Sequence, residues 1–405
     1  MNGILSGMRI IEGSAFVAAP LGGMTLAQLG ADVIRFDNIG GGLDYRRWPV
    51  TQDGHSLYWA DLNKGKRSIA VNLRSPEGRE LLTNLICAPG DDAGLFLTNF
   101  PPRGWLAYDN LVQQRADLIQ VTIMGDWEGG TAVDYTVNSR IGMPFLTGTV
   151  PNDEPVNHVL PAWDCLTGQM AAVGLLAAER QRMRTGQGQH IKLALADVAL
   201  ATMGNLAYLS EVAVNDADRS RHGNHLFGAF GKDFATRDGK RLMLVGITPR
   251  QWRSIGEATG LADELAALGE RLGLDFRQEG DRFVAREEIA ALIGGWIGAR
   301  DLGEITAVFN QHRVCWGPYQ TVRQFVEQDA DYAGASPLFS PITQPNIGSY
   351  MAPGSPLRFG GANNLPAKPA PQLGEHTDEI LAELLGLSGG EIGRLHDAGV
   401  VAGSE

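Results

Sequence analysis

Short apolar runs alternate with helical patterns along the first part of the chain. Residues 7–37 read as an apolar strand, a loop of small residues, a helix that begins near Pro20 and a second strand. Further strands are expected at 68–73, 93–97 and 117–123, with a helix that begins at Pro76. This alternation predicts a parallel sheet covered by helices.

The first loop excludes one familiar use of such a βαβ opening. It reads GSAFVAAPLGG and lacks the GxGxxG pattern that cradles a dinucleotide pyrophosphate. Asp37 closes the second strand, where dinucleotide-binding folds carry an acid for the ribose hydroxyl. Without the glycine pattern, we interpret Asp37 as a solvated residue at a strand end.

The pattern changes after residue 210, which divides the chain. Residues 1–210 form the expected large domain, and the polar, glycine-bearing residues 211–230 form a linker or lid. Asp238-Gly239 between two apolar runs predicts a hairpin, and helical patterns follow at 249–259, 262–272, 286–297 and 302–312. These elements define a smaller α+β domain over 231–328. Residues 329–405 are expected to return over the large domain as a Pro/Gly-rich coil that ends in a helix over 377–385.

Composition and charge restrict the classes of function. The 405 residues are 44% hydrophobic and 20% charged, with a mean hydropathy of -0.10, which is typical of globular proteins rather than of disordered or membrane-spanning ones. A net charge of -12 without a basic block argues against a nucleic-acid or membrane partner. Three widely spaced cysteines fit a reducing, cytoplasmic compartment, and no metal-ligand spacing is visible.

The segment around Asp164 is the strongest candidate for chemistry. Asp164 lies between a proline-containing extended stretch and a helix whose faces are nearly all apolar or small. As an N-cap, its side chain would accept the free amides of the first turn. As a partly desolvated carboxylate it would be a usable nucleophile, and the two readings can coexist. Gly168 and Gly174 are expected to be small because another backbone packs close.

Basic islands in this acidic chain offer places for an anionic ligand. One is the loop 63–68, with Lys64, Lys66 and Arg67, and another is Arg46-Arg47-Trp48. Each fits solvated surface as well as a phosphate site. The stretch 98–103 follows the carboxyl end of a strand, which is the usual ligand side of an open α/β sheet.

Ordered motifs along nearly the whole chain resemble the class III CoA-transferase family. They include NKGKRSIAVNLRSPEGRELL, LTNFPP, LPAWDCLTG, RTGQGQHIKLAL and LGEHTDEILAELLG. The resemblance implies a Rossmann-like large domain with parallel strands, a smaller α+β domain and an interlocked homodimer. It also implies an aspartate nucleophile at Asp164 that passes through an acyl anhydride and an enzyme-CoA thioester. CoA is then part of the acyl-CoA substrate, and no cofactor is implied.

The resemblance also assigns weaker roles, residue by residue. The matching motifs make candidates for CoA contacts of Asn63, Lys66, Arg67, Asn99 and Arg103, and place Trp48, Tyr58, His225, Phe227 and Gly228 in the acyl pocket or lid. The loop GNHLFGAFG carries bulkier residues than the glycine loop of some members, which suggests a tighter lid. The racemase branch has a histidine where this chain has Val133, so a racemase is disfavoured.

Within the family, the likeness is strongest to members that move CoA between the C1 and C4 carboxyls of mesaconate. The expected activity is therefore an intramolecular CoA transfer. Two alternatives stay open: an intermolecular transferase for another carboxylic acid, and a CoA-binding subunit without activity.

Overall fold

The computed structural model describes residues 3–149 and 154–404, which form two compact units. The first unit contains residues 3–141, 159–209 and 329–404, and the second contains the remainder. Residues 142–149 and 154–158, expected in the large domain, belong to the second unit. There the Val156 amide donates to Pro144 O (2.9 Å) and the Arg221 guanidinium donates to Phe145 O (3.2 Å).

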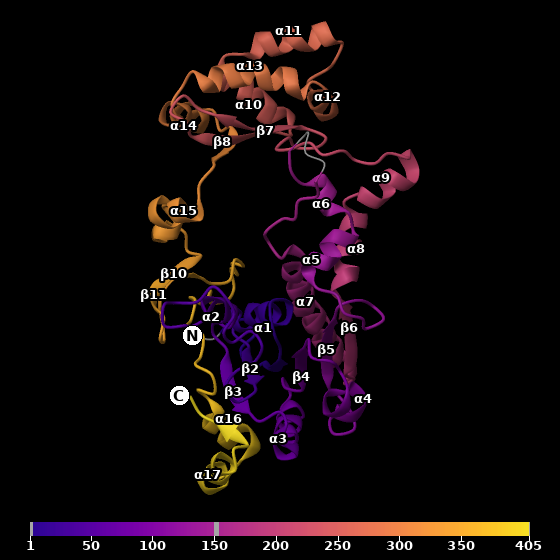
Figure 1. Ribbon diagram of the computed structural model, residues 1–405, viewed down its shortest axis with the longest axis vertical. Helices are drawn as coiled ribbons and strands as arrows, with labels where there is room; N and C mark the ends of the chain where they lie inside the picture. Colours follow the sequence, from indigo (N-terminus) through magenta and orange to yellow (C-terminus); the bar gives the residue numbers. More distant parts are fainter. Residues whose placement is uncertain (1–2, 150–153, 405) are drawn as a thin grey trace. The chain divides into compact units, whose positions relative to one another are not determined.

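A seven-stranded sheet forms the centre of the first unit, in the order β12-β3-β2-β1-β4-β5-β6 (Figure 1). Six strands are parallel, and the short β12 pairs antiparallel with β3. The strands are β1 (Arg9–Gly13), β2 (Asp32–Asp37), β3 (Arg67–Val71), β4 (Leu95–Thr98), β5 (Ile119–Met124), β6 (Gln189–Ala194) and β12 (Val401–Ala402). The order 3-2-1-4-5-6 is that of a Rossmann fold, so the predicted parallel-sheet architecture is confirmed. Its strand order reverses between β1 and β4, where such folds bind ligands.

Helices cover both faces of this sheet. Ile10 faces a core that includes Leu26 and Leu175, whereas its neighbour Ile11 faces a core that includes Leu82 and Ile380. This opposite orientation follows from the two-residue period of a strand. The helices are α1 (Ala18–Gln28), α2 (Leu57–Leu62), α3 (Pro76–Ile86), η1 (Gly104–Leu106), α4 (Tyr108–Leu111), α5 (Asp134–Arg140), α7 (Ala162–Thr185), α8 (Leu195–Asn205), η2 (Asp331–Ala335), α16 (Thr377–Leu385) and α17 (Gly389–Asp397).

Two glycines let α1 and α7 approach closely. A Cβ on Gly22 would lie 2.9 Å from Gly168 O, and a Cβ on Gly168 would lie 2.7 Å from Ala18 O. The expectation that Gly168 is small because of a close backbone is therefore confirmed. At Gly174 the nearest neighbour is instead a side-chain atom of Ile191, at 3.7 Å. The contact at Gly168 fixes the first turns of α7 against the start of α1.

The second unit is built on a three-stranded antiparallel sheet. The predicted hairpin at Asp238-Gly239 joins β7 (Phe230–Ala235) to β8 (Arg241–Gly246), which pairs with β9 (Cys315–Pro318). The remaining helices are α6 (Met143–Leu146), α9 (Tyr208–Asn215, which begins in the first unit), α10 (Pro249–Thr259), α11 (Ala262–Leu272), α12 (Glu279–Val284), α13 (Arg286–Gly298), α14 (Leu302–Gln311) and α15 (Val322–Gln328). The four helices predicted here are present.

The return segment contains more regular structure than its composition predicts. The expected coil includes a hairpin of β10 (Phe339–Gln344) and β11 (Gly348–Pro353), and α17 and β12 follow the predicted helix. Pro341 is tolerated because this sheet has two strands, each with a free edge. Figure 1 shows the yellow C-terminal segment beside the first strands, where Val401 pairs with Val71. No helix among the described residues is long and apolar enough to cross a membrane.

Candidate active site

The first turn of α7 carries Asp164, but Asp164 does not cap the helix. The backbone N–H groups of Trp163 and Asp164 donate to Oδ2 of Asp134, at 2.8 and 3.1 Å. The capping interpretation of Asp164 is therefore wrong, because Asp134 of α5 satisfies these amides. The Asp164 carboxylate is left available for chemistry.

A third hydrogen bond fixes the same turn of α7 to α5. The Trp163 indole Nε1 donates to Oδ1 of Asn138 (3.2 Å), and both side chains are buried. Asp134 and Asn138 are four residues apart and so lie on one face of α5. Together they hold the backbone and the ring of the residue that precedes Asp164.

Burial and a neighbouring charge make Asp164 an unusually basic carboxylate. Burial, and after it the negative charge of Asp134, raise the pKa of Asp164 to about 6, although the Arg47 guanidinium opposes both effects. At neutral pH this carboxyl is still mostly ionised. A carboxylate with a raised pKa that is not protonated is a stronger nucleophile than an ordinary surface aspartate.

Arg47 lies between two aromatic rings beside Asp164. Its guanidinium carbon is 5.4 Å from the centre of the Phe16 ring and 5.2 Å from that of Tyr58. Burial raises the pKa of the Tyr58 hydroxyl, Asp164 raises it further, and Arg47 opposes this effect. Among the described residues, no carboxylate lies within ion-pair distance of Arg47. This exposed cation hydrogen-bonds to Tyr58 and is not neutralised by an ion pair with a described residue, so it can meet an anionic group of a ligand.

The loop after β1 is clamped where the strand order reverses. Asn99, at the carboxyl end of β4, donates to Ala15 O (2.7 Å) and accepts from Ala15 N (2.9 Å). The Phe16 amide donates to Asp44 (3.0 Å), and Phe16 has a φ of 68°. A left-handed backbone is rare for a bulky residue and is maintained only by such surroundings. The hydrogen bonds to Asn99 and Asp44 hold the Phe16 ring beside Arg47.

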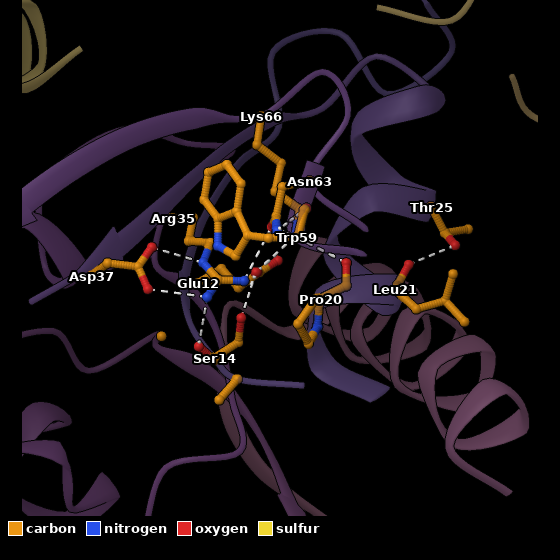
Figure 2. Close-up of polar contacts among 12 residues, drawn as sticks. Glu12, Ser14, Pro20, Leu21, Thr25, Arg35, Asp37, Trp59, Asn63 and Lys66 are labelled. Atoms are coloured by element: carbon orange, nitrogen blue, oxygen red, sulfur yellow. Dashed lines mark hydrogen bonds and ion pairs between the residues drawn. The ribbon is translucent and has the colours of Figure 1, made fainter. Parts of the chain in front are cut away.

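A buried network of ion pairs and hydrogen bonds supports the loop after β1 (Figure 2). The Lys66 ammonium donates to Glu12 (2.7 Å), to Asn63 (2.8 Å) and to Pro20 O (2.9 Å). Burial lowers the pKa of Lys66 to about 8, although Glu12 opposes this effect. Ser14 donates to the same oxygen of Glu12 (2.7 Å), which connects the network to the loop.

Arg35 forms the second half of the network. It donates to Asp37 (2.8 Å), to Asp44 (3.0 Å) and to Ser14 O (3.1 Å), and it is 1% exposed. The interpretation of Asp37 as a solvated residue is therefore wrong. Arg35 and Asp37 lie two residues apart on β2 and so point to the same face, where they form a buried pair.

Four of the five predicted CoA-binding residues make hydrogen bonds or ion pairs within the chain. Asn63 and Lys66 belong to the buried network. Arg67 lies at the amino-terminal end of β3, where it pairs with Asp32, Glu379 and Glu383 at 2.6 to 3.0 Å. The loop that contains Phe16 follows the carboxyl end of β1. Because the strands are parallel, Arg67 lies toward the amino-terminal ends of the strands and this loop at their carboxyl ends. Asn99 takes part in the clamp.

Two further candidates are exposed. Trp48 is 79% exposed and follows Arg47 directly. Arg103 is exposed after β4, and its side chain has no hydrogen bond or ion pair with a described residue. Tyr58, the other predicted pocket residue, is half-buried in the wall beside Arg47.

The predicted lid residues belong to the second unit. Nε2 of His225 contacts Lys232 (3.0 Å) and Glu287 (3.1 Å). The Phe227 ring packs on Phe283, with ring centres 5.1 Å apart. Gly228 has a φ of 78°, which a glycine adopts without strain. The structure therefore gives this loop defined contacts within its own unit.

Sequence reasoning missed two residues of the site. Asp134 lies next to Val133, the position considered for a racemase histidine, and its spacing to Asn138 was a usable signal for one helix face. Phe16 carried no signal, because a left-handed backbone at a non-glycine residue depends on the surrounding contacts.

Comparisons with known proteins are consistent along the whole chain. The model of CoA-transferase family III matches residues 5–377. The chain is 64% identical to the 2-methylfumaryl-CoA isomerase of Chloroflexus aurantiacus, over 100% of this chain and 99% of that protein. It is 30% identical to the succinate–glutarate CoA-transferase of Agrobacterium fabrum, over 94% and 95%.

A solved structure shows the same fold. The crystal structure of a CaiB/BaiF family protein from Brucella suis superposes with a TM-score of 0.76 and 26% identity, covering 95% of this chain and 100% of that one. The likeness includes both units rather than one isolated domain.

Proposed function

Because the chain belongs to CoA-transferase family III, we propose that it is an intramolecular CoA transferase with Asp164 as its nucleophile. It moves CoA from the C1 to the C4 carboxyl of mesaconate, which converts 2-methylfumaryl-CoA into its 3-methylfumaryl isomer. The observation that carries the proposal is the available, basic Asp164 carboxylate beside a cation without an ion-pair partner. The 64% identity to a 2-methylfumaryl-CoA isomerase supports the substrate.

The geometry of the substrate explains why a protein carboxylate is needed. The carboxyls of mesaconate are trans across a double bond, so they cannot close into a cyclic anhydride. Asp164 attacks the C1 thioester carbonyl, which forms a mixed anhydride and releases the CoA thiolate. The thiolate then attacks the aspartyl carbonyl, which gives an aspartyl-CoA thioester and free mesaconate.

The second half of the reaction repeats these steps in reverse. The C4 carboxylate attacks the aspartyl thioester and expels the thiolate, and the thiolate attacks the C4 carbonyl and restores Asp164. Every bond that breaks is replaced, so no water, oxidant or reductant is consumed. Retention of both partners makes each step effectively unimolecular, with effective molarities of about 10⁵–10⁸ M. Mesaconate must turn end for end before it diffuses away.

Arg47 is suited to hold the carboxylate of mesaconate that is not reacting. Its planar guanidinium can bind a carboxylate through two hydrogen bonds, and the Phe16 and Tyr58 rings fix its position. For the CoA moiety we propose Asn99 and the exposed Arg103, which both follow the carboxyl end of β4. Lys66 supports the site from below through Glu12.

We also propose an interlocked homodimer. Leu166, Met170 and Val173 form an exposed apolar stripe on α7, at 41%, 47% and 57% exposure. Residues at this spacing share one helix face, and such stripes are typical of covered surfaces. Met170→Glu should weaken the dimer, as measured by light scattering at several protein concentrations.

Chemical trapping tests the covalent intermediates. Incubation with 2-methylfumaryl-CoA and hydroxylamine should convert the anhydride or thioester at Asp164 into a hydroxamate, which peptide mass spectrometry can locate. Asp164→Ala should show no hydroxamate and no isomerisation. Full activity in that variant would contradict the proposed function.

A further inference from the structure

We propose that Asp134 is a positioning residue for Asp164: one carboxylate oxygen fixes the first turn of α7, and the negative charge keeps Asp164 strongly nucleophilic. This inference rests on the proposed role of Asp164. Helix α5 lies outside the segment that carries Asp164, yet in this proposal it sets both the position and the reactivity of Asp164.

Hydrogen bonds carry the positioning part. Oδ2 of Asp134 accepts from the backbone amides of Trp163 and Asp164, at 2.8 and 3.1 Å, and so contacts the nucleophile's own backbone. Asn138 holds the Trp163 ring through Nε1 at 3.2 Å. The turn is thus held at three points by two side chains on one face of α5.

The other carboxylate oxygen supplies the second part of the argument. Asp134 is 2% exposed, and its Oδ1 is buried without a hydrogen-bond partner among the described residues. A buried carboxylate oxygen that accepts no hydrogen bond is rare, because the lost solvation is not replaced. A neutral side chain could accept the same two amides, so helix capping alone does not require this charge. The charge does act on Asp164, since it raises the pKa of that carboxyl.

The other groups that influence Asp164 are few. Arg47, from the loop after β2, lowers the pKa of Asp164 and thus opposes Asp134. Burial raises the pKa of Tyr58 of α2 and of Cys165 of α7, and the charge of Asp164 raises each of them further. Burial is the largest influence on Asp164 and does not depend on Asp134. The effect of the Asp134 charge can therefore be separated from burial by substitution.

Three variants separate capping from charge. Asp134→Asn keeps an oxygen that can accept both amides but removes the charge, whereas Asp134→Ala removes both. Asn138→Ala is the matched control, because it loses a bond to the same turn and leaves the charge in place. In the wild type, the pH profile of kcat/KM with 2-methylfumaryl-CoA should fall on its acid side with a midpoint near pH 6, which we call the acid limb.

In Asp134→Asn we expect the acid limb to move toward lower pH without reaching 3.8, because burial remains. The activity plateau should fall by a factor on the order of ten or less, since a less basic carboxylate is a weaker nucleophile. Asn138→Ala should keep its limb near pH 6, and Asp134→Ala should lose more activity than Asp134→Asn. An unchanged limb in Asp134→Asn would overturn the proposal.

A titration that needs no turnover distinguishes this inference from the proposed function. Infrared difference spectra of wild type minus Asp164→Asn report the carbonyl stretch of the protonated carboxyl as pH is lowered. The same difference recorded in the Asp134→Asn background should show protonation at lower pH. If this shift occurs while no acyl-CoA is converted, the proposed function fails and the electrostatic role of Asp134 stands. If the two titrations coincide, the inference fails even for an active enzyme.

Discussion

An ionised Asp164 should destabilise the folded protein, and Asp164→Asn should remove that cost. Folding raises the pKa of Asp164 from 3.8 to about 6, so the folded chain binds this proton more tightly than the unfolded chain does. Ionisation therefore opposes folding. The cost is absent below about pH 3.8, grows between 3.8 and 6, and is complete above 6. At about 1.4 kcal/mol per pH unit it amounts to roughly 3 kcal/mol at pH 7.5.

Urea denaturation measures this cost directly. Wild type and Asp164→Asn should be unfolded between pH 4.5 and 7.5 at one fixed protein concentration, because association would otherwise change the apparent stability. The variant should be more stable at pH 7.5, and its advantage should shrink as pH falls below 6. Asparagine has nearly the same shape as aspartate, so packing changes contribute little. As the proposed nucleophile is removed, the same variant should lose nearly all activity, so Asp164 would lower stability in exchange for function.

Asp117→Asn is a control for which we expect the opposite change in folding stability. The Arg115 guanidinium holds the pKa of Asp117 below its ordinary value, although burial opposes it. Its ionised form therefore favours folding, and the substitution should destabilise the protein at neutral pH. If Asp164→Asn is no more stable than wild type at pH 7.5, or if its advantage is independent of pH, the reasoning about Asp164 is wrong.

The remaining predictions concern Arg47 and the side chains that support the loop after β1. Arg47→Ala should lower kcat/KM for 2-methylfumaryl-CoA by about tenfold to a hundredfold, the range of a charge-assisted hydrogen bond. An acyl-CoA with no second carboxylate should be affected less, and Arg46→Ala, an exposed neighbour, should change neither rate by more than about threefold. Arg47→Ala should also move the acid limb to higher pH, because this cation lowers the pKa of the nucleophile. Glu12→Gln should destabilise the protein by about 3–5 kcal/mol in urea titrations, because Lys66 is left buried without its counter-charge. Asn99→Ala should speed amide hydrogen exchange in the loop after β1, since both bonds of its clamp are lost.

Local patterns were enough to predict much of the architecture. Pro76 follows Ser75, which accepts a hydrogen bond from Gly78 N, so the start of α3 could be placed from capping chemistry. The hairpin at Asp238-Gly239 and the capping box of Thr248 and Gln251 have the same local origin. Such elements depend on neighbours within a few residues, and the chain itself supplies them.

Features that depend on distant partners could not be predicted. Asp37 looked solvated because nothing in its neighbourhood indicates burial with Asp44, which follows a glycine loop. Asp164 looked like a cap because the true acceptor, Asp134, lies 30 residues earlier. Lys66 and Arg67 look alike in the sequence, yet one is buried against Glu12 and the other forms ion pairs with α16. The residue types indicated charge, whereas the partners were set by tertiary structure.

The central claim is that CoA moves between the two carboxyls of one mesaconate through Asp164. The most direct measurement incubates the purified protein with 2-methylfumaryl-CoA and an excess of isotopically labelled free mesaconate. The C4 isomer is then isolated and its mass determined. The account predicts unlabelled product, because the acid turns within the site before it can exchange. Labelled product would contradict intramolecular transfer and identify an enzyme that passes CoA to a second acid.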